Sequence, residues 1–566
     1  MFHFLTRRDV VLVLSILGVG ALSVLERDPL SVPFAITVVL VIAALFFSIT
    51  GRLGASLLLS WAIVFIVAAV SLTKQRLMGF NAHVFDLMTF VGDRESMLFV
   101  LGNYWKTLLP LPIVLLLTGW VVRGLFRAEK PLRLAVGWRL LATAAAAALL
   151  PLSYPRAPND HGYYMGGHFA SSLFVSLSDA SFLFEEIDIS REVASRQALA
   201  QFDPTNKCGQ MASAPDLYIV HMESMFAPSL YPDWKYGGPE GYLARETANW
   251  KPLRVETFAG ASWTTTFSLM TGLPAADFGW MRPYLPIFME GYIKNSLPLA
   301  MAACGYRTVA VMPTRYQMVN EGPFLKSIGF QEVYDRDAVG APSMHARDKQ
   351  FYDFTAKLVS EHRAAKDPRP LFVFVQTMTT HGPYEDEFQP EETVAGIPFG
   401  NSPEIDEFLR RMTLARQDYA PFLAAVDANK AKGGAVVLEY GDHQPSVSQA
   451  SADSVVQGNA ASDWGSPLYQ TYYDVRTFGR DIAPLPKMTM DVGFLGATIA
   501  EAARLPGNEA QSALLALRDR CQGAFQGCAE KNLVWDHLRR LSDSGMLRLP
   551  GVTSMQPGSA AVAEFP

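Results

Sequence analysis

The sequence predicts an α/β protein in which about five N-terminal transmembrane helices precede a domain with a mostly parallel central sheet. Three observations support this prediction. Long apolar runs occur only before about residue 155, although 50% of all 566 residues are hydrophobic. From residue 214 onwards, short apolar runs alternate with helical patterns, which is typical of a parallel sheet covered by helices on both faces. Two of these runs stop abruptly at charged or imidazole side chains, as strands that lead to a site do.

The membrane part is predicted to occupy residues 1–155. Its apolar runs lie at residues 10–25, 33–50, 54–72, 108–122 and 137–151, and a bilayer-spanning helix needs about 20 mostly apolar residues. The second and third runs meet this requirement, and the others meet it when interfacial residues are included. The first run follows Arg7 and Arg8 but lacks a small-residue cleavage site, so an uncleaved anchor is favoured over a signal peptide.

Basic residues set the predicted orientation, because cytoplasmic loops usually carry the excess of Lys and Arg. With the N-terminus in the cytoplasm, the inner segments hold Arg7, Arg8, Arg52, Arg123, Arg127, Lys130, Arg133 and Arg139, whereas the outer loop holds Lys74, Arg76, Arg94 and Lys106. An odd number of spans then places everything after residue 155 outside the cytoplasm.

Beyond the membrane part, we predict a linker with helices at residues 156–213, a catalytic domain at 214–547 and a flexible tail at 548–566. Strands are expected from Ala214 and at 307–312, 371–376 and 435–440, and helices at 294–304, 323–328, 348–365 and 403–429. Residues 489–547 are expected to be mainly helical. The tail consists largely of Gly, Ser, Pro and Ala and has few residues that can anchor it.

Charge and cysteine content narrow the class of protein. The formal net charge of −6 gives no basic footprint for nucleic acid. Cys521 and Cys528 enclose a short loop without further ligands at metal spacing, which favours a disulfide over a zinc site. Whether Cys208 and Cys304 pair or stay buried is left open by the sequence.

Three separate stretches offer the side chains of a metal-assisted transfer site. Residues 216–224 read as a buried strand that ends at Glu223, and residues 435–445 read as a second strand that ends at Asp442 and His443. Between them, Ser262 follows a glycine loop and begins a helical pattern, where unpaired N–H groups favour an anion or an alkoxide. Oxygen and nitrogen ligands of this kind suit a hard or borderline divalent ion, which activates a nearby hydroxyl.

Each of these residues also has an interpretation that involves no functional site. A lone Glu at a strand end is usually a hydrogen-bonded or solvated carboxylate, and only its combination with Ser262, Asp442 and His443 favours a site. His221 and His345 have no evident partners in the sequence and are predicted to be structural. The spans contain few ionisable residues, which argues against a transporter.

Further motifs carry a resemblance to a known family. Residues 271–273 read Thr-Gly-Leu, residues 380–384 read Thr-His-Gly-Pro-Tyr and residues 441–443 read Gly-Asp-His. In this order, after five spans, they resemble the lipoteichoic acid synthase family of the alkaline phosphatase and sulfatase superfamily, which includes phosphoglycerol transferases that act on periplasmic glucans. The resemblance extends to about residue 500 and implies an alkaline-phosphatase-like catalytic domain.

The resemblance also implies roles for individual residues. Glu223, Asp442 and His443 match the family's metal ligands, with Mn²⁺ the usual ion and Zn²⁺ the ion of related phosphoethanolamine transferases. Ser262 matches the nucleophile and metal contact, a threonine in lipoteichoic acid synthases, although the hydroxyls at 264–266 lie close enough in sequence for a different register. His381 matches a headgroup-binding histidine, and Arg315 is a candidate for phosphate binding in a segment that departs from the family pattern.

The predicted function is transfer of phosphoglycerol from phosphatidylglycerol to the hydroxyl of an extracytoplasmic glycan or glycolipid, through a covalent serine intermediate. The implied location is the bacterial cytoplasmic membrane, with the catalytic domain in the periplasm or outside. A phosphoethanolamine transferase acting on lipopolysaccharide or glycan, and a sulfatase-like phosphodiesterase, are the alternatives. The Cys/Ser-x-Pro-x-Arg context of sulfatases is missing at Ser262, Cys208 and Cys304, which argues against a sulfatase. A binding module with a vestigial site would have damaged metal ligands, whereas the ligands in this sequence are intact, which argues against such a module.

Overall fold

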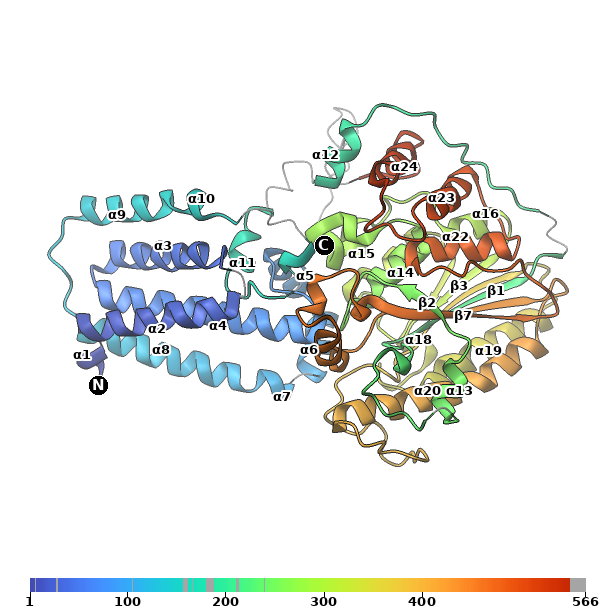
Figure 1. The fold of residues 1–566 in the computed structure, drawn as a ribbon, viewed down its shortest axis with the longest axis horizontal. Coiled ribbons are helices and arrows are strands. Elements are labelled where there is room, and N and C mark those ends of the chain that lie inside the picture. Colours follow the sequence, from blue (N-terminus) through green and yellow to red (C-terminus); the bar gives the residue numbers. More distant parts are fainter. Residues whose placement is uncertain are drawn as a thin grey trace. The chain divides into compact units, whose positions relative to one another are not determined.

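The computed structural model describes residues 1–5, 7–26, 29–103, 105–155, 161–164, 166–179, 188–209, 213–238 and 240–549. The chain divides into two compact units, Met1–Ser181 and Phe182–Pro566 (Figure 1). The predicted tail lies outside the described residues, apart from residues 548 and 549.

The first unit contains five helices that are long and apolar enough to cross a membrane, as predicted. They are α2 (Arg8–Glu26), α3 (Val32–Thr50), α4 (Leu53–Met78), α8 (Pro110–Ala128) and the pair α9 (Val136–Ala148) and α10 (Leu150–Ser153), and they run alongside one another in Figure 1. Large apolar side chains on their outer faces are exposed, for example Leu116 at 75%. Such faces need an apolar solvent, which a bilayer supplies.

Shorter segments cover one end of this helix group. Three helices connect α4 to α8, namely α5 (Val84–Gly92), α6 (Arg94–Asn103) and α7 (Trp105–Leu108). Glu26, at the end of α2, is fully buried and accepts hydrogen bonds from the backbone N–H groups of Ala170 and Ser171, both at 2.9 Å. His83 Nε2 lies 3.0 Å from Asp179. Residues 161–164 and 166–179, predicted to belong to the linker, therefore belong to the first unit.

The second unit is built around one eight-stranded sheet with the order β4-β3-β5-β1-β6-β7-β2-β8. Its strands are β1 (Asp216–Met222), β2 (Lys251–Arg254), β3 (Arg307–Val311), β4 (Glu332–Tyr334), β5 (Leu371–Gln376), β6 (Ala435–Gly441), β7 (Gln470–Phe478) and β8 (Met490–Asp491). The strands from β4 to β6 are all parallel, whereas β7 runs antiparallel to both β6 and β2. The mostly parallel sheet is thus as predicted, with a mixed edge that the sequence did not reveal.

Helices cover both faces of the sheet (Figure 1). The helices α14 (Ser262–Thr271), α16 (Leu297–Ala303), α17 (Glu321–Ser327), α22 (Val492–Ala502), α23 (Glu509–Arg520) and α24 (Lys531–Asp543) contribute to one core, and α19 (Asp348–Ala364) and α20 (Pro403–Ala428) contribute to the other. Alternate residues of β1 enter opposite cores, Leu217 and Ile219 on one face and Tyr218 and Val220 on the other, because successive side chains of a strand point to opposite faces.

Short helices complete the described elements. They are α1 (Phe2–Leu5), α11 (Ser172–Val175), α12 (Asp188–Ser195), α13 (Tyr242–Thr247), α15 (Leu285–Phe288), α18 (Arg336–Val339) and α21 (Gln449–Val456). The 3₁₀ segments are His161–Tyr164, Pro228–Leu230, Ala275–Tyr284, Met318–Asn320, Ser446–Ser448, Ala460–Ser462 and Pro467–Tyr469.

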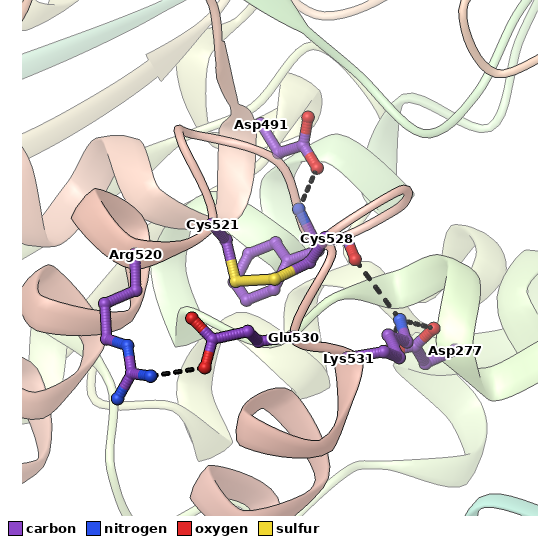
Figure 2. Close-up of a disulfide and its surroundings, with 8 residues drawn as sticks. Asp277, Asp491, Arg520, Cys521, Cys528, Glu530 and Lys531 are labelled. Carbon is purple, nitrogen blue, oxygen red and sulfur yellow. Dashed lines mark hydrogen bonds and ion pairs between the residues drawn. A yellow bond between two sulfur atoms is a disulfide. The ribbon is translucent and has the colours of Figure 1, made fainter.

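Two disulfides hold the second unit. Cys521 pairs with Cys528, as predicted, and Cys208 pairs with Cys304, which settles the alternative that the sequence left open. Figure 2 shows the Cys521–Cys528 loop between Asp491, which accepts a hydrogen bond from the Phe525 N–H at 2.6 Å, and Lys531, which pairs with Asp277 at 2.8 Å. The loop is thereby fixed to the end of the sheet and to the segment after α14.

Candidate active site

Two neighbouring strands deliver the acidic residues of the candidate site. Strands β1 and β6 are parallel, with Met222 opposite Gly441, so the next residues, Glu223 and Asp442, leave the same edge of the sheet side by side. A Cβ atom on Gly441 would lie 1.8 Å from the Met225 carbonyl oxygen. Glycine at this position therefore allows the chain after β1 to cross close to the end of β6.

Ser262 comes to the same edge at the first turn of α14. The residues before it, Ala259 and Ala261, have left-handed backbone with φ of 60° and 58°, a conformation that non-glycine residues rarely adopt and that is often found at functional sites. The Ala259 N–H donates to the Gln444 carbonyl at 2.9 Å, and the Thr265 hydroxyl donates to the Asp442 carbonyl at 2.6 Å. Both ends of this segment are thus tied to the residues that follow β6.

The polar atoms of four predicted residues converge. The Ser262 hydroxyl donates to Glu223 Oε2 at 3.1 Å and lies 3.2 Å from His443 Nε2. His443 Nε2 in turn lies 3.5 Å from Glu223 Oε1 and 3.2 Å from Asp442 Oδ2. Glu223, Asp442 and His443 are at most 2% exposed, so this is a dry cluster in which charge interactions are strong.

The neighbouring threonines occupy different places. Thr264, Thr265 and Thr266 are buried within α14. The Thr265 hydroxyl is used on the Asp442 carbonyl, and the Thr266 hydroxyl lies 3.4 Å from His221 Nδ1. The Thr264 hydroxyl forms no hydrogen bond with any described residue. Ser262 is therefore the hydroxyl of this helix that contacts Glu223 and His443.

His221 was predicted to be structural and without partners; the lack of partners was wrong, and its structural role stays a prediction. Its Nε2 lies 3.1 Å from Asp442 Oδ2, and its Nδ1 lies 2.9 Å from the Tyr440 hydroxyl. Burial alone would lower the pKa of His221, but the neighbouring Tyr440 and Asp442 raise it well above its usual value. A local signal existed, because His221 precedes Glu223 by two positions and alternate residues of a strand share a face.

Backbone and hydroxyl donors fix the two carboxylates. The Ser224 N–H donates to Asp442 Oδ1 at 2.7 Å, and the Ser224 hydroxyl donates to Glu223 Oε1 at 2.7 Å. The Glu223 N–H donates to the Thr377 hydroxyl at 3.1 Å. Burial alone would raise the pKa of Glu223, but the imidazoles of His443 and His221 hold it well below its ordinary value. Glu223 is consequently ionised.

The cluster has the ligand set of a divalent cation. Asp442 Oδ2 is buried and faces two imidazole nitrogens, His221 Nε2 at 3.1 Å and His443 Nε2 at 3.2 Å, so carboxylate and imidazole donor atoms converge as the ligands of a divalent ion do. His443 Nδ1 donates to the Gln444 carbonyl at 3.0 Å, so in the neutral ring Nε2 carries the lone pair that faces the carboxylates. His221, Glu223 and Asp442 also offer ligand atoms within 4.8 Å of one another.

His381 approaches the cluster from the loop that follows β5. The loop is tied to Glu223 by the Thr380 hydroxyl, which donates to the Glu223 carbonyl oxygen. His381 Nδ1 donates to the Gly382 carbonyl at 2.6 Å, and the charge of His381 contributes to the low pKa of Glu223. The ring is half-buried, so part of it is accessible from solvent.

Arg315, the predicted phosphate-binding residue, lies elsewhere on the sheet. It follows β3, and β5 separates that strand from β1. Arg315 Nε lies 3.3 Å from Asp337 Oδ2, and the Arg315 side chain is 40% exposed. The arrangement pairs Arg315 with an acidic neighbour, and its role in phosphate binding stays a prediction.

Comparisons with known proteins agree with this architecture. Residues 220–473 match the family model described as Sulfatase. Over 341 residues, the chain is 23% identical to an uncharacterized Haemophilus influenzae protein, and over 245 residues it is 26% identical to a Rhizobium meliloti protein named "Putative cyclic beta-1,2-glucan modification protein". These alignments cover 56% and 41% of this chain, and 59% and 36% of those relatives.

Solved structures with a similar fold include two transferases. The Streptococcus pyogenes phosphoglycerol transferase GacH in complex with sn-glycerol-1-phosphate aligns at 13% identity and a TM-score of 0.44, over 65% of this chain and 90% of GacH. The integral membrane protein lipooligosaccharide phosphoethanolamine transferase A from Neisseria meningitidis aligns at 12% identity and a TM-score of 0.49, over 84% of this chain and 95% of that protein. By its match to the family model, the chain has a sulfatase-like domain, which follows five apolar helices.

Proposed function

We propose that this chain is a membrane-anchored, metal-dependent transferase that moves phosphoglycerol from phosphatidylglycerol to a glycan or glycolipid hydroxyl. The observation that carries the proposal is the position of the Ser262 hydroxyl. It lies at the N-terminus of α14, 3.1 Å from Glu223 Oε2 and 3.2 Å from His443 Nε2, and that same Nε2 lies 3.2 Å from Asp442 Oδ2. The site therefore combines a nucleophilic hydroxyl with a set of metal ligands. It also lies at a helix N-terminus, which favours binding of a phosphoryl group.

The site is suited to a two-step transfer. In the first step the Ser262 oxygen attacks phosphorus, the Ser262 proton leaves along its hydrogen bond to Glu223, and the bond from phosphorus to the diacylglycerol oxygen breaks. His381 in its protonated form gives its Nε2 proton to that oxygen, and diacylglycerol departs. A phosphoglycerol group remains esterified to Ser262.

The second step reverses the roles of the same residues. Neutral His381 accepts the proton of an acceptor hydroxyl at Nε2, because its Nδ1 proton is held by the Gly382 carbonyl. The acceptor oxygen forms a bond to phosphorus, the bond from phosphorus to Ser262 breaks, and Ser262 recovers its proton from Glu223. The product is a phosphoglycerol-modified glycan, and every group returns to its starting protonation state.

A divalent cation, Mn²⁺ or Zn²⁺, would be held by Glu223, Ser262, Asp442 and His443, with His221 beside them. When bound, such an ion neutralises charge on the phosphoryl oxygens and lowers the pKa of the serine hydroxyl. His221 helps to position the Asp442 carboxylate through the 3.1 Å contact between His221 Nε2 and Asp442 Oδ2. The two hydrogen bonds from Ser224 fix the carboxylates that would bind the ion.

Substrate and location follow from the same proposal. A lipid donor is expected because the five apolar helices keep the domain at a membrane. Two disulfides within the second unit suit an oxidising compartment, and this supports the proposed position of the domain in the periplasm or outside the cell. A glycan acceptor is supported by the name of the Rhizobium meliloti relative.

The decisive experiment follows diacylglycerol release by the purified full-length protein in lipid–detergent micelles. Phosphatidylglycerol and phosphatidylethanolamine are supplied separately, each with Mn²⁺ or Zn²⁺. We expect turnover of phosphatidylglycerol and accumulation of a phosphoglycerol adduct on Ser262 when no acceptor is present. Preference for phosphatidylethanolamine would replace the proposal by a phosphoethanolamine transferase, and the absence of turnover with either lipid would refute it.

A further inference from the structure

A second histidine stands beside His381, although the two are far apart in sequence. The ring centroids of His345 and His381 are 5.6 Å apart, with the ring planes inclined by 60°. Both side chains are half-buried. The charges that act on His345 are those of His381, Arg411 and Glu223. His345 therefore belongs to the neighbourhood of the site, which corrects the prediction that it has no partners.

The two histidine loops are joined by one buried carboxylate. Asp348 begins α19, three positions after His345, and its Oδ1 accepts the N–H groups of Met378 and Thr379 at 2.8 and 2.9 Å. The Asp348 N–H donates to the Thr379 hydroxyl at 2.9 Å. These bonds attach the segment that carries His345 to the loop that carries His381.

Helix α20 holds both loops from the other side. Arg411 donates to the His381 carbonyl at 2.6 Å and to the Pro383 carbonyl at 2.9 Å, and Glu407 fixes the same guanidinium at 2.6 Å. Arg347 donates two hydrogen bonds to Asp418, at 2.8 and 2.6 Å. Because two arginines and a carboxylate fix the loops, the separation of the two imidazoles is set by the fold.

The chemical state of His345 selects what it can bind. Burial, together with the nearby His381 and Arg411, lowers the pKa of His345 to about 3. A neutral imidazole offers one N–H donor and one nitrogen acceptor, which is the complement of a hydroxyl group. The uncharged ring itself supplies neither a positive charge for a phosphate nor a negative charge for an ammonium group.

We propose that His345 binds a hydroxyl group of the substrate next to His381, and so favours a glycerol headgroup or a sugar over an ethanolamine headgroup. This inference rests on the proposed phosphoglycerol transfer and names a residue that determines its specificity. The hydroxyl belongs either to the glycerol of the donor or to the glycan acceptor. Both present the same chemistry to a neutral imidazole.

The test compares three donors that differ only in the headgroup. Phosphatidylglycerol carries hydroxyls, phosphatidylethanolamine carries an ammonium group and phosphatidylmethanol carries neither. Diacylglycerol release is measured for the full-length wild type, His345→Ala and His345→Gln without acceptor, and phosphoglycerol transfer is measured with a β-glucan oligosaccharide. His362→Gln is the matched control, since His362 lies near the far end of α19 and its Nε2 donates to the Arg369 carbonyl at 2.9 Å.

If His345 binds the donor, His345→Ala lowers the second-order rate constant for the first release of diacylglycerol from phosphatidylglycerol about tenfold and leaves that for phosphatidylmethanol unchanged, because one hydrogen bond to a substrate hydroxyl is lost. His345→Gln, which keeps a donor and an acceptor, recovers part of this loss. If His345 binds the acceptor, release without glucan is unchanged and transfer to the glucan falls about tenfold. Either pattern supports the proposal and identifies the source of the hydroxyl.

Equal losses on phosphatidylglycerol and phosphatidylmethanol would assign His345 a structural role and overturn the inference, as would unchanged rates in both assays. A comparable loss in His362→Gln would have the same consequence. If wild type releases no diacylglycerol from any donor, the proposed function itself fails. If wild type turns over phosphatidylglycerol and His345→Ala does so at the same rate in both assays, the inference about His345 fails and the proposed function stands.

Discussion

The two sides of the candidate site are held in different ways. On the metal side, Glu223 and Asp442 are the first residues after two adjacent parallel strands, so the register of the sheet places them. On the histidine side, His381 and His345 lie on separate loops, which are held by side chains of α20 and by Asp348. The central sheet therefore sets the position of the proposed metal ligands, whereas long-range polar contacts set the position of the residues proposed to meet the substrate.

The comparison implies that changes on the two sides have different signatures. A change on the metal side should alter ion binding, and activity should fall as a consequence. A change on the histidine side should alter turnover or substrate selection while the ion stays bound. The following predictions separate these effects, beginning with the residue where both sides meet.

The largest effect is expected for Ser262→Ala. Without the attacking oxygen no covalent intermediate forms, so diacylglycerol release should fall at least about 10⁴-fold, in line with the loss of a nucleophile in other enzymes. Thr264→Val on the same helix is the matched control, because the Thr264 hydroxyl is buried and forms no hydrogen bond within the described residues. Full activity of Ser262→Ala, or inactivity of Thr264→Val alone, would move the nucleophile to another residue.

The metal side was accessible to sequence analysis because its signals are local. A buried apolar run that stops at Glu223 or at Asp442 and His443 is visible within a few residues, and β5 was predicted with its observed bounds, since all its positions are buried. The contacts of His221 were not visible, because Tyr440 lies on β6 and Asp442 directly follows that strand, more than 200 positions later in the chain.

The histidine side was predicted only in part, for the same physical reason. His381 lies in a recognisable motif, but His345 has no local signal, and only the Asp348 and Arg411 contacts bring it to the site. Strand β7 was missed because Asp474 and Arg476 interrupt its apolar pattern, and β2, β4 and β8 are too short to be distinguished from loops. These four strands form because they pair with strands that are distant in the sequence.

A moderate effect restricted to the metal side is expected for Ser224→Ala. The change removes the hydroxyl that donates to Glu223 Oε1 at 2.7 Å and keeps the backbone N–H that donates to Asp442. Loss of a residue that orients a ligand typically weakens metal affinity about 10- to 100-fold. Titration of the metal-free protein with Mn²⁺ or Zn²⁺ measures this affinity, and activity should recover at saturating ion.

The exposed Ser454 on α21 provides the control for this change, as Ser454→Ala should leave affinity unchanged. Undiminished metal affinity in Ser224→Ala, or lost activity that saturating ion does not restore, would contradict the assignment of Ser224 to the metal side.

A smaller effect is expected on the histidine side for Arg411→Lys. Lysine keeps the charge but cannot reach the carbonyls of His381, Pro383 and Asp386 together, as the arginine fork does. The His381 loop should loosen, and kcat should fall about tenfold while metal affinity is retained, because the cost corresponds to roughly one charged hydrogen bond. Arg476→Lys on β7 serves as the control, and a loss of bound metal in Arg411→Lys would erase the distinction between the two sides.

The smallest effect on activity, but a clear effect on stability, is expected for Asp348→Asn. Burial raises the pKa of Asp348 from 3.8 to about 6, so the folded protein holds this proton more tightly than the unfolded chain does. Proton binding by Asp348 therefore stabilises the folded protein by at most about 3 kcal/mol. This stabilisation is complete below about pH 4 and is lost as the pH rises through about 6.

Asparagine keeps an oxygen for the N–H groups of Met378 and Thr379 and does not titrate. The stability of the Asp348→Asn variant relative to wild type should therefore rise between about pH 4 and pH 7. The midpoint of thermal unfolding of both proteins, measured at each pH, tests this. Phosphatidylglycerol turnover should stay near the wild-type rate, since the bonds between the two histidine loops persist. A variant whose unfolding midpoint parallels that of wild type at every pH would mean that Asp348 is ionised in the folded protein throughout this range, and that its carboxylate joins the two loops as an anion.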